Sequence, residues 1–159
     1  MRSATGGVTW WGGFLDVRTR AKARIVARGA TIPEKAGRTT MLVGVDNASA
    51  RIVDASVLPK DPFLGTFTVR IPDGVEVVYV PYPGEEGWGD CSPAKPGRRT
   101  YVCRIPERLD QGQPVLQPFV VKVDPRRVSK PGRVTLQLRP DARSWDSSTA
   151  DNSAAIVVQ

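Results

Sequence analysis

The sequence predicts an all-β protein, an antiparallel two-sheet β-sandwich of about seven strands that follows an extended N-terminal arm. Fourteen Pro and fifteen Gly interrupt the 159 residues at short intervals. Almost no apolar run keeps the 3.6-residue period of an amphipathic helix. Short alternating segments instead follow one another with turns between them and no crossover helix, which excludes a doubly wound α/β fold.

Strand signals recur along most of the chain. Apolar side chains alternate most clearly with polar ones at residues 119–123 and 133–139, as expected for strands with one buried face. Pro72-Asp73-Gly74 separates two further segments and predicts a turn, because proline fixes φ and glycine accepts a positive φ. In chain order the segments are residues 39–46, 52–58 (the weakest), 67–71, 75–80, 100–104, 119–123, 133–139 and 154–158.

Cys91 and Cys103 are the two cysteines of the chain, with eleven residues between them. An even count at close spacing in a β-rich chain predicts one disulfide and therefore an oxidising compartment. The alternative is a pair of free thiols in a cytosolic protein. A disulfide would imply that the protein is secreted. No apolar stretch typical of a signal peptide is visible, so we expect that such a peptide has been removed. Likewise, no run is long enough to insert into a membrane.

We expect residues 1–24 to form an arm and residues 25–159 the sandwich. In the arm Arg18, Arg20 and Lys22, continued by Arg24, occupy every second position. An extended chain would carry them as a basic ladder on one face. Arg, Lys and Ala are also good helix formers, so strand and helix both stay open here.

Aromatic and apolar side chains precede this ladder. Trp10 and Trp11 are adjacent, so on an extended chain they face opposite sides and cannot both enter one core. At least one is free for a partner or a sugar, the alternative being a cap on the sandwich edge. Together with Phe14 and Leu15 they are the candidate anchors of an interface.

Catalytic and metal-binding signals are weak. Histidine is absent, which removes the commonest general base and most zinc sites. No phosphate-binding glycine motif or nucleophile-elbow string occurs. Carboxylates in turn-forming segments are ordinarily solvated, so we expect neither an enzyme nor a cofactor, while calcium near Asp146 and Asp151 stays open. The acidic candidates are Glu85, Glu86, Asp90, Asp141, Asp146 and Asp151.

The net charge of +7 and a pI of about 9.9 are compatible with nucleic acid, a wall polymer or an acidic protein as partner. Nucleic-acid binding would require aromatic residues among the basic ones, and both basic loops lack them. We therefore expect solvated loops there. Trp88 is expected to pack on the disulfide. The basic loop residues are Lys95, Arg98, Arg99, Arg126, Arg127, Lys130 and Arg133.

From Arg24 onward the order of these signals resembles the conserved-repeat, immunoglobulin-like domain family of bacterial secreted and surface proteins. The matched pieces are a strand–turn–strand motif, an aromatic residue with paired cysteines, a Gly-centred turn before a long strand, and an Asn-rich turn before the last strand. The resemblance implies an immunoglobulin-like sandwich in an extracellular setting. These pieces are residues 69–77, then Trp88, Cys91 and Cys103, then residues 111–113 and 151–158.

Together these observations predict a secreted, non-catalytic binding module, an adaptor or assembly subunit of an extracellular complex. Its arm would add a strand to the sheet edge of an acidic protein partner. The alternative is a module that binds carbohydrate or cell wall through its tryptophans.

Overall fold

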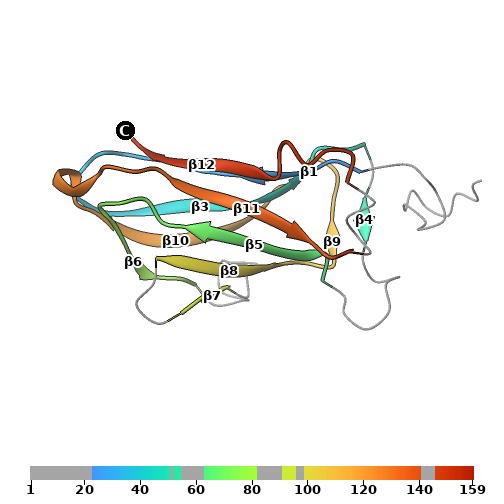
Figure 1. Cartoon of the computed structure of the whole chain (residues 1–159), viewed down its shortest axis with the longest axis horizontal. Coiled ribbons are helices and arrows are strands. Elements are labelled where there is room, and N and C mark those ends of the chain that lie inside the picture. Colours follow the sequence, from blue (N-terminus) through green and yellow to red (C-terminus); the bar gives the residue numbers. More distant parts are fainter. Residues whose placement is uncertain (1–22, 51, 55–62, 82–90, 96–98, 141–145) are drawn as a thin grey trace, which may run out of the picture.

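A computed structural model describes residues 23–50, 52–54, 63–81, 91–95, 99–140 and 146–159, and this part is almost entirely β-structure (Figure 1). Seven of its strands have five or more residues. A 3₁₀ turn, η1, lies between β10 and β11. The elements are β1 (Ile25–Arg28), β2 (Ala30–Ile32), β3 (Gly37–Asn47), β4 (Val53–Asp54), β5 (Gly65–Arg70), β6 (Val75–Tyr79), β7 (Cys91–Pro93), β8 (Thr100–Ile105), β9 (Arg108–Leu109), β10 (Val115–Val123), η1 (Pro125–Arg127), β11 (Gly132–Leu138) and β12 (Ser153–Val158).

Two sheets contain most of these strands. A four-stranded sheet has the order β1-β3-β10-β6, and a six-stranded sheet has the order β2-β12-β11-β5-β8-β7. Strands β4 and β9 form a separate pair. Neighbouring strands run antiparallel except β12 and β2, which are parallel. The six-stranded sheet is therefore mixed, where the sequence predicted antiparallel pairing throughout.

The parallel pair arises because the chain changes sheets between β1 and β2. Strand β1 pairs with β3 in one sheet, and after Gly29 strand β2 pairs with β12 in the other. At this crossing the backbones nearly touch, since a Cβ at Gly29 would lie 1.8 Å from the carbonyl oxygen of Ala155. Only glycine fits such an approach.

One hydrophobic core lies between the two large sheets. Met41, Val43 and Phe119 enter it from the four-stranded sheet, and Phe67 and Ile156 from the six-stranded sheet. Strand β11 alternates without exception, with Val134, Leu136 and Leu138 buried and the residues between them exposed or at the surface. The alternation predicted for residues 133–139 is thus confirmed.

The predicted strands and the structure agree best where a strand is long. Strands β3, β5, β6, β8, β10, β11 and β12 each contain or closely match a predicted segment. Of the weak segment 52–58, residues 53 and 54 form β4, and 55–58 lie outside the described residues. The first two strands and the short β7 and β9 were not predicted, because segments of two to four residues show no readable period.

The turn predicted at Pro72-Asp73-Gly74 is confirmed and connects β5 to β6. Gly74 has φ +77°, and a Cβ there would lie 2.6 Å from the backbone nitrogen of Val128. The turn therefore packs directly on the loop that follows η1. This contact fixes one end of the molecule, where the site described next is located.

Candidate functional site

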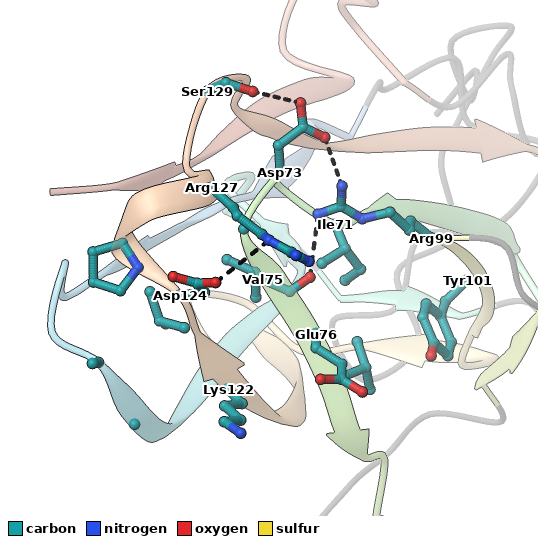
Figure 2. A pocket seen from close by; sticks show the side chains of 16 residues that line it. Ile71, Asp73, Val75, Glu76, Arg99, Tyr101, Lys122, Asp124, Arg127 and Ser129 are labelled. Atoms are coloured by element: carbon teal, nitrogen blue, oxygen red, sulfur yellow. Dashed lines mark hydrogen bonds and ion pairs between the residues drawn. The ribbon is translucent and has the colours of Figure 1, made fainter.

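A groove opens between β6, at the edge of the four-stranded sheet, and β8 of the six-stranded sheet. Its volume is about 1080 Å³, close to the upper end of the roughly 300–1,000 Å³ of typical ligand pockets. Figure 2 shows the labelled side chains that surround it, from the turn after β5, from β6, β8 and β10, and from the loop after η1. The groove thus lies between the edge strand of one sheet and β8, the second strand from the edge of the other.

The floor of the groove is apolar. Val77 follows the inward register of β6, since it pairs with the buried Val121, yet it is only partly covered. Across the opening, Tyr101 of β8 packs edge-on against Phe119, with ring centroids 5.4 Å apart. Partial burial raises the pKa of the Tyr101 hydroxyl. Ile71 closes the floor between these side chains (Figure 2).

Asp73 organises the rim of the groove. One carboxylate oxygen accepts a hydrogen bond from the Ser129 hydroxyl at 2.8 Å, and the other pairs with the Arg99 guanidinium at 2.6 Å. The Ser129 hydrogen bond, and then the charges of Arg99 and Lys130, lower the pKa of Asp73, while partial desolvation opposes them. Arg99 also donates to the carbonyl of Val75 at 3.2 Å. Three segments are therefore tied together at the rim.

The rim charges compensate one another. The residues lining the groove include three acids and three bases. Besides the pair at Asp73, Arg127 lies 3.6 Å from Asp124. Glu76 stands opposite Lys122 in the sheet register. The groove is thus electrically balanced, although the whole chain carries a net charge of +7.

Strand β6 presents an edge beside this groove. Within the described part of the chain it pairs only with β10, on one side. The pairing is interrupted by a bulge at Val78, because Val77 and Tyr79 oppose consecutive residues of β10. Val78 and Tyr79 are 41% and 43% exposed, and with Leu42 they are the exposed large hydrophobic residues of the described region. A sheet edge that pairs on one side only is a template for strand pairing.

The outer face of the same sheet continues this apolar surface. Tyr79 pairs with Val120 of β10, and Leu42 of β3 pairs with Pro118 of β10. Residues directly opposite one another lie on the same face of a sheet. Tyr79, Val120 and Leu42 therefore line one strip of this face together with Pro118, which is itself buried.

The site residues predicted in the arm have mostly no description in the structure. Seven of them, Trp10, Trp11, Phe14, Leu15, Arg18, Arg20 and Lys22, lie outside the described residues. Arg24 is described, and its guanidinium pairs with Asp151 at 2.7 Å. Ala23 before it is buried and forms a bridge with Asp146. The last rung of the basic ladder is therefore held on the sandwich by an ion pair.

The predicted disulfide is present. Cys91 of β7 and Cys103 of β8 face each other in the sheet register, and their sulfur atoms are bonded at 2.01 Å. The bond attaches β7, the last strand of its sheet, to β8 beside the groove. Trp88, which was expected to pack on it, lies outside the described residues.

Two carboxylates that the sequence offered for calcium have structural roles. One oxygen of Asp146 accepts from the backbone N–H groups of Ile25 and Ser148, at 3.3 and 3.4 Å. Asp151 pairs with Arg24. Among the described residues no group of three or more acidic or cysteine side chains is arranged to hold a metal ion. The calcium interpretation stays a prediction.

The groove was not recognised from the sequence. Its residues come from segments far apart in the chain, and two basic loops expected to be solvated meet there, where Arg99 and Arg127 pair with acids. One signal was present. In residues 77–80 four apolar side chains follow one another without alternation, which is unusual for a strand with one solvated face.

No helix in the described part of the chain is long and apolar enough to cross a membrane. No model of a known protein family matches the chain, and a search of curated proteins finds no match to it either. The resemblance to conserved-repeat, immunoglobulin-like domains therefore stays a prediction from the sequence.

Proposed function

We propose that this protein is a secreted, non-catalytic binding module that joins other proteins by strand addition. In strand addition an extended segment pairs with an exposed sheet edge through its backbone, and alternate side chains fill neighbouring pockets. The observation that carries the proposal is the position of β6. This strand is the last in the order of its sheet within the described region, and its partly covered Val77 faces the groove.

Groove and edge fit an extended polypeptide better than a compact ligand. Every second side chain of an added strand would point between the sheets, toward Val77 and Tyr101. The side chains between them would lie outside, beside Tyr79 and the strip with Leu42. An added strand would thus cover apolar surface on both of its faces.

The N-terminal arm is the segment that this chain offers in return. Trp10, Trp11, Phe14 and Leu15 are its anchors in the proposal, because large apolar side chains carry most interface energy. The ladder of Arg18, Arg20, Lys22 and Arg24 would speed the encounter with an acidic partner. The module would therefore both give and receive a strand, as an adaptor or assembly subunit does.

An immunoglobulin-like topology and secretion are parts of the same proposal. Two sheets around one core and a disulfide between neighbouring strands support them. Disulfides form and persist mainly outside the cytosol. Absence of catalysis is proposed because the sequence holds no histidine and the groove floor is apolar.

Capture with matched variants tests the proposal. The full chain, a Val77→Lys variant and a Val157→Lys control are each immobilised and exposed to the culture medium of the source cells. At position 77 the lysine stem would occupy the groove while its ammonium group reaches water. Val157 is a partly exposed residue of β12, outside the groove lining. Proteins retained by the full chain and the control but lost from Val77→Lys are the expected result.

A second comparison concerns the arm. A variant with serine at Trp10, Trp11, Phe14 and Leu15, called here the arm variant, should lose those partners that receive a strand. Equal recovery of every bound protein by the full chain, Val77→Lys and the arm variant would overturn the proposal. Retention on purified cell wall alone would instead favour the carbohydrate alternative.

A further inference from the structure

We infer that the outer face of the six-stranded sheet binds a linear acidic polysaccharide through two facing arginines, Arg70 and Arg133. The inference goes beyond the proposed function, because β6 belongs to the other sheet and accepts a different class of partner. Three observations support it: the composition of the face, the position of its arginines, and the location of the exposed hydrophobic residues elsewhere.

The outer face of this sheet is polar. Side chains alternate along a strand, so every second residue of β5, β8, β11 and β12 points away from the core. Figure 1 shows β11, β5 and β8 side by side along the molecule. The register arranges the outward residues in three rows across the strands. These rows are Ala155, Arg133, Arg70 and Thr100; Ser153, Thr135, Thr68 and Val102; and Gln137, Thr66 and Arg104.

Arg70 and Arg133 lie directly opposite each other on neighbouring strands, and both side chains are exposed. Like charges in this position destabilise a sheet. None of the four strands β5, β8, β11 and β12 contains an acidic residue that could compensate them. A guanidinium group can donate two parallel hydrogen bonds to one carboxylate. A carboxylate of a ligand between the two arginines would therefore replace a repulsion by two attractions.

A second facing pair of cations shows what is missing here. In the four-stranded sheet Arg38 lies opposite Lys122, but Glu76 lies opposite Lys122 on the other side. That carboxylate compensates the like charges within the fold. The row that holds Arg70 and Arg133 has no acid at either end. Its compensating charge therefore has to come from outside the chain.

The loop before β11 adds cations beside this row. The backbone N–H of Asp73 donates to the carbonyl of Lys130 at 3.0 Å, so Lys130 lies close to the end of β5. The acid of this turn and the acid before η1 already pair with Arg99 and Arg127. Arg126 and Lys130 form no ion pair within the described region. The positive surface thus continues from the sheet onto the loop.

The face lacks the anchors of a protein interface. Large aromatic and apolar side chains carry most interface energy. The exposed large hydrophobic residues of the described region, Leu42, Val78 and Tyr79, lie in the four-stranded sheet or next to its bulge. Threonine hydroxyls and the Gln137 amide accompany the arginines instead. These groups donate and accept hydrogen bonds, as sugar hydroxyls do. An acidic polysaccharide therefore fits the face better than an acidic protein.

Nucleic acid is the other anionic polymer that the charge would suit. Single strands bind by stacking their bases on aromatic side chains, and the outward positions of β5, β8, β11 and β12 hold none. Duplex DNA can bind through its phosphates alone. The disulfide, however, favours a compartment outside the cytosol. The choice of a polysaccharide over duplex DNA rests on this part of the proposed function.

Binding to polygalacturonate, a linear polymer with a carboxylate on each sugar, tests the inference. The full chain is compared with Arg70→Gln plus Arg133→Gln, called here the face variant. The control is Lys35→Gln plus Arg38→Gln, which removes the same charge from exposed positions outside this face. By calorimetry the face variant should bind about tenfold more weakly, the effect of losing one charge-assisted hydrogen bond. The control should lose clearly less affinity, and neutral dextran should not bind.

Two further measurements separate geometry and folding from charge. Replacing both arginines by lysine keeps the charge but removes the paired hydrogen bonds. This variant should bind more weakly than the wild type and more tightly than the face variant. The polymer should also raise the midpoint of thermal unfolding of the wild type but not of the face variant. Each protein is compared with itself without polymer, so a change in basal stability does not affect the result.

Several outcomes would overturn the inference. The full chain could fail to bind polygalacturonate even at low ionic strength, or the face variant and the control could lose affinity equally. Tighter binding to duplex DNA or to polyglutamate at the same ionic strength would contradict the choice of partner. Strand addition is tested separately, since Val77→Lys should bind the polymer as the wild type does. If the face variant loses the polymer while no protein is captured from the medium, strand addition fails and this inference stands.

Discussion

The guanidinium of Arg99 donates to the carboxylate of Asp73, with Nη1 and Oδ1 2.6 Å apart. The contact joins the disulfide hairpin to the turn between β5 and β6, and Ser129 binds the second carboxylate oxygen. The backbone repeats the connection, since Ile71 donates to the carbonyl of Arg99 and Asp73 to that of Lys130. Contacts within the chain therefore hold the rim of the groove in place without a bound partner.

In the Asp73→Asn variant the free energy of unfolding should fall less steeply in acid than it does in the wild type. The folded state lowers the pKa of this carboxyl below 3.8, so ionisation stabilises the fold above that pH, and the contribution is lost as the pH falls through the lowered value. The variant should be less stable at pH 7, with a shallower decline below pH 3.8. Chemical denaturation at several pH values, with Asp110→Asn as a surface control, measures it. Parallel pH curves for variant and wild type would contradict this role.

Gly74→Ala should destabilise the protein by about 1–3 kcal/mol, because alanine resists the left-handed conformation and its Cβ would overlap Val128. Gly112→Ala is the matched control. Gly112 also has a positive φ, of 64°, but nothing lies within 4 Å of a Cβ there. The control should therefore lose less free energy of unfolding. Equal losses would show that packing against the η1 loop contributes nothing.

Removing the disulfide by Cys91→Ala with Cys103→Ala should lower the free energy of unfolding by somewhat under about 3 kcal/mol, from the chain entropy of a loop this short. For a protein of this size the midpoint of thermal unfolding should fall by roughly 6–10 °C. Calorimetry of the variant, and of the wild type with and without reductant, checks this. If the variant and the oxidised wild type have the same midpoint of thermal unfolding, the disulfide does not stabilise the fold and the prediction is wrong.

Asn47→Ala should cost about 1–3 kcal/mol, the usual effect of leaving a buried polar group unpaired. The Asn47 amide is fully buried and donates to the carbonyl of Leu109 at 3.0 Å, which joins the end of β3 to β9. Gln113→Ala, at an exposed position nearby, is the control. Equilibrium denaturation of both variants measures the difference, and an unchanged Asn47→Ala variant would refute it.

The sequence predicted correctly those strands and turns whose evidence lies within one short segment. The alternation of Val134, Leu136 and Leu138 with polar residues predicts which face of the strand is buried. Pro72-Asp73-Gly74 likewise predicts the turn between two strands. It failed at the parallel pair of β2 with β12, because the change of sheet at Gly29 depends on a close approach to Ala155, far away in sequence.

The groove could not be predicted for a related reason. Val77 and Tyr101 become neighbours of one opening only because β6 pairs with β10 and β8 with β5, and neither pairing joins consecutive strands. The sequence showed which residues are apolar, but not which strand would remain at an edge. For the arm, the prediction of a binding segment stays a prediction.

Amide hydrogen exchange of β6 tests the central claim most directly. The full chain is measured alone and in complex with a protein that it captures from the culture medium and that Val77→Lys does not retain. If an extended segment of that partner pairs along this edge, the amides of residues 75–79 should exchange more slowly in the complex, while those of β12 should not change. Unchanged exchange along β6 in a saturated complex would contradict strand addition at this site.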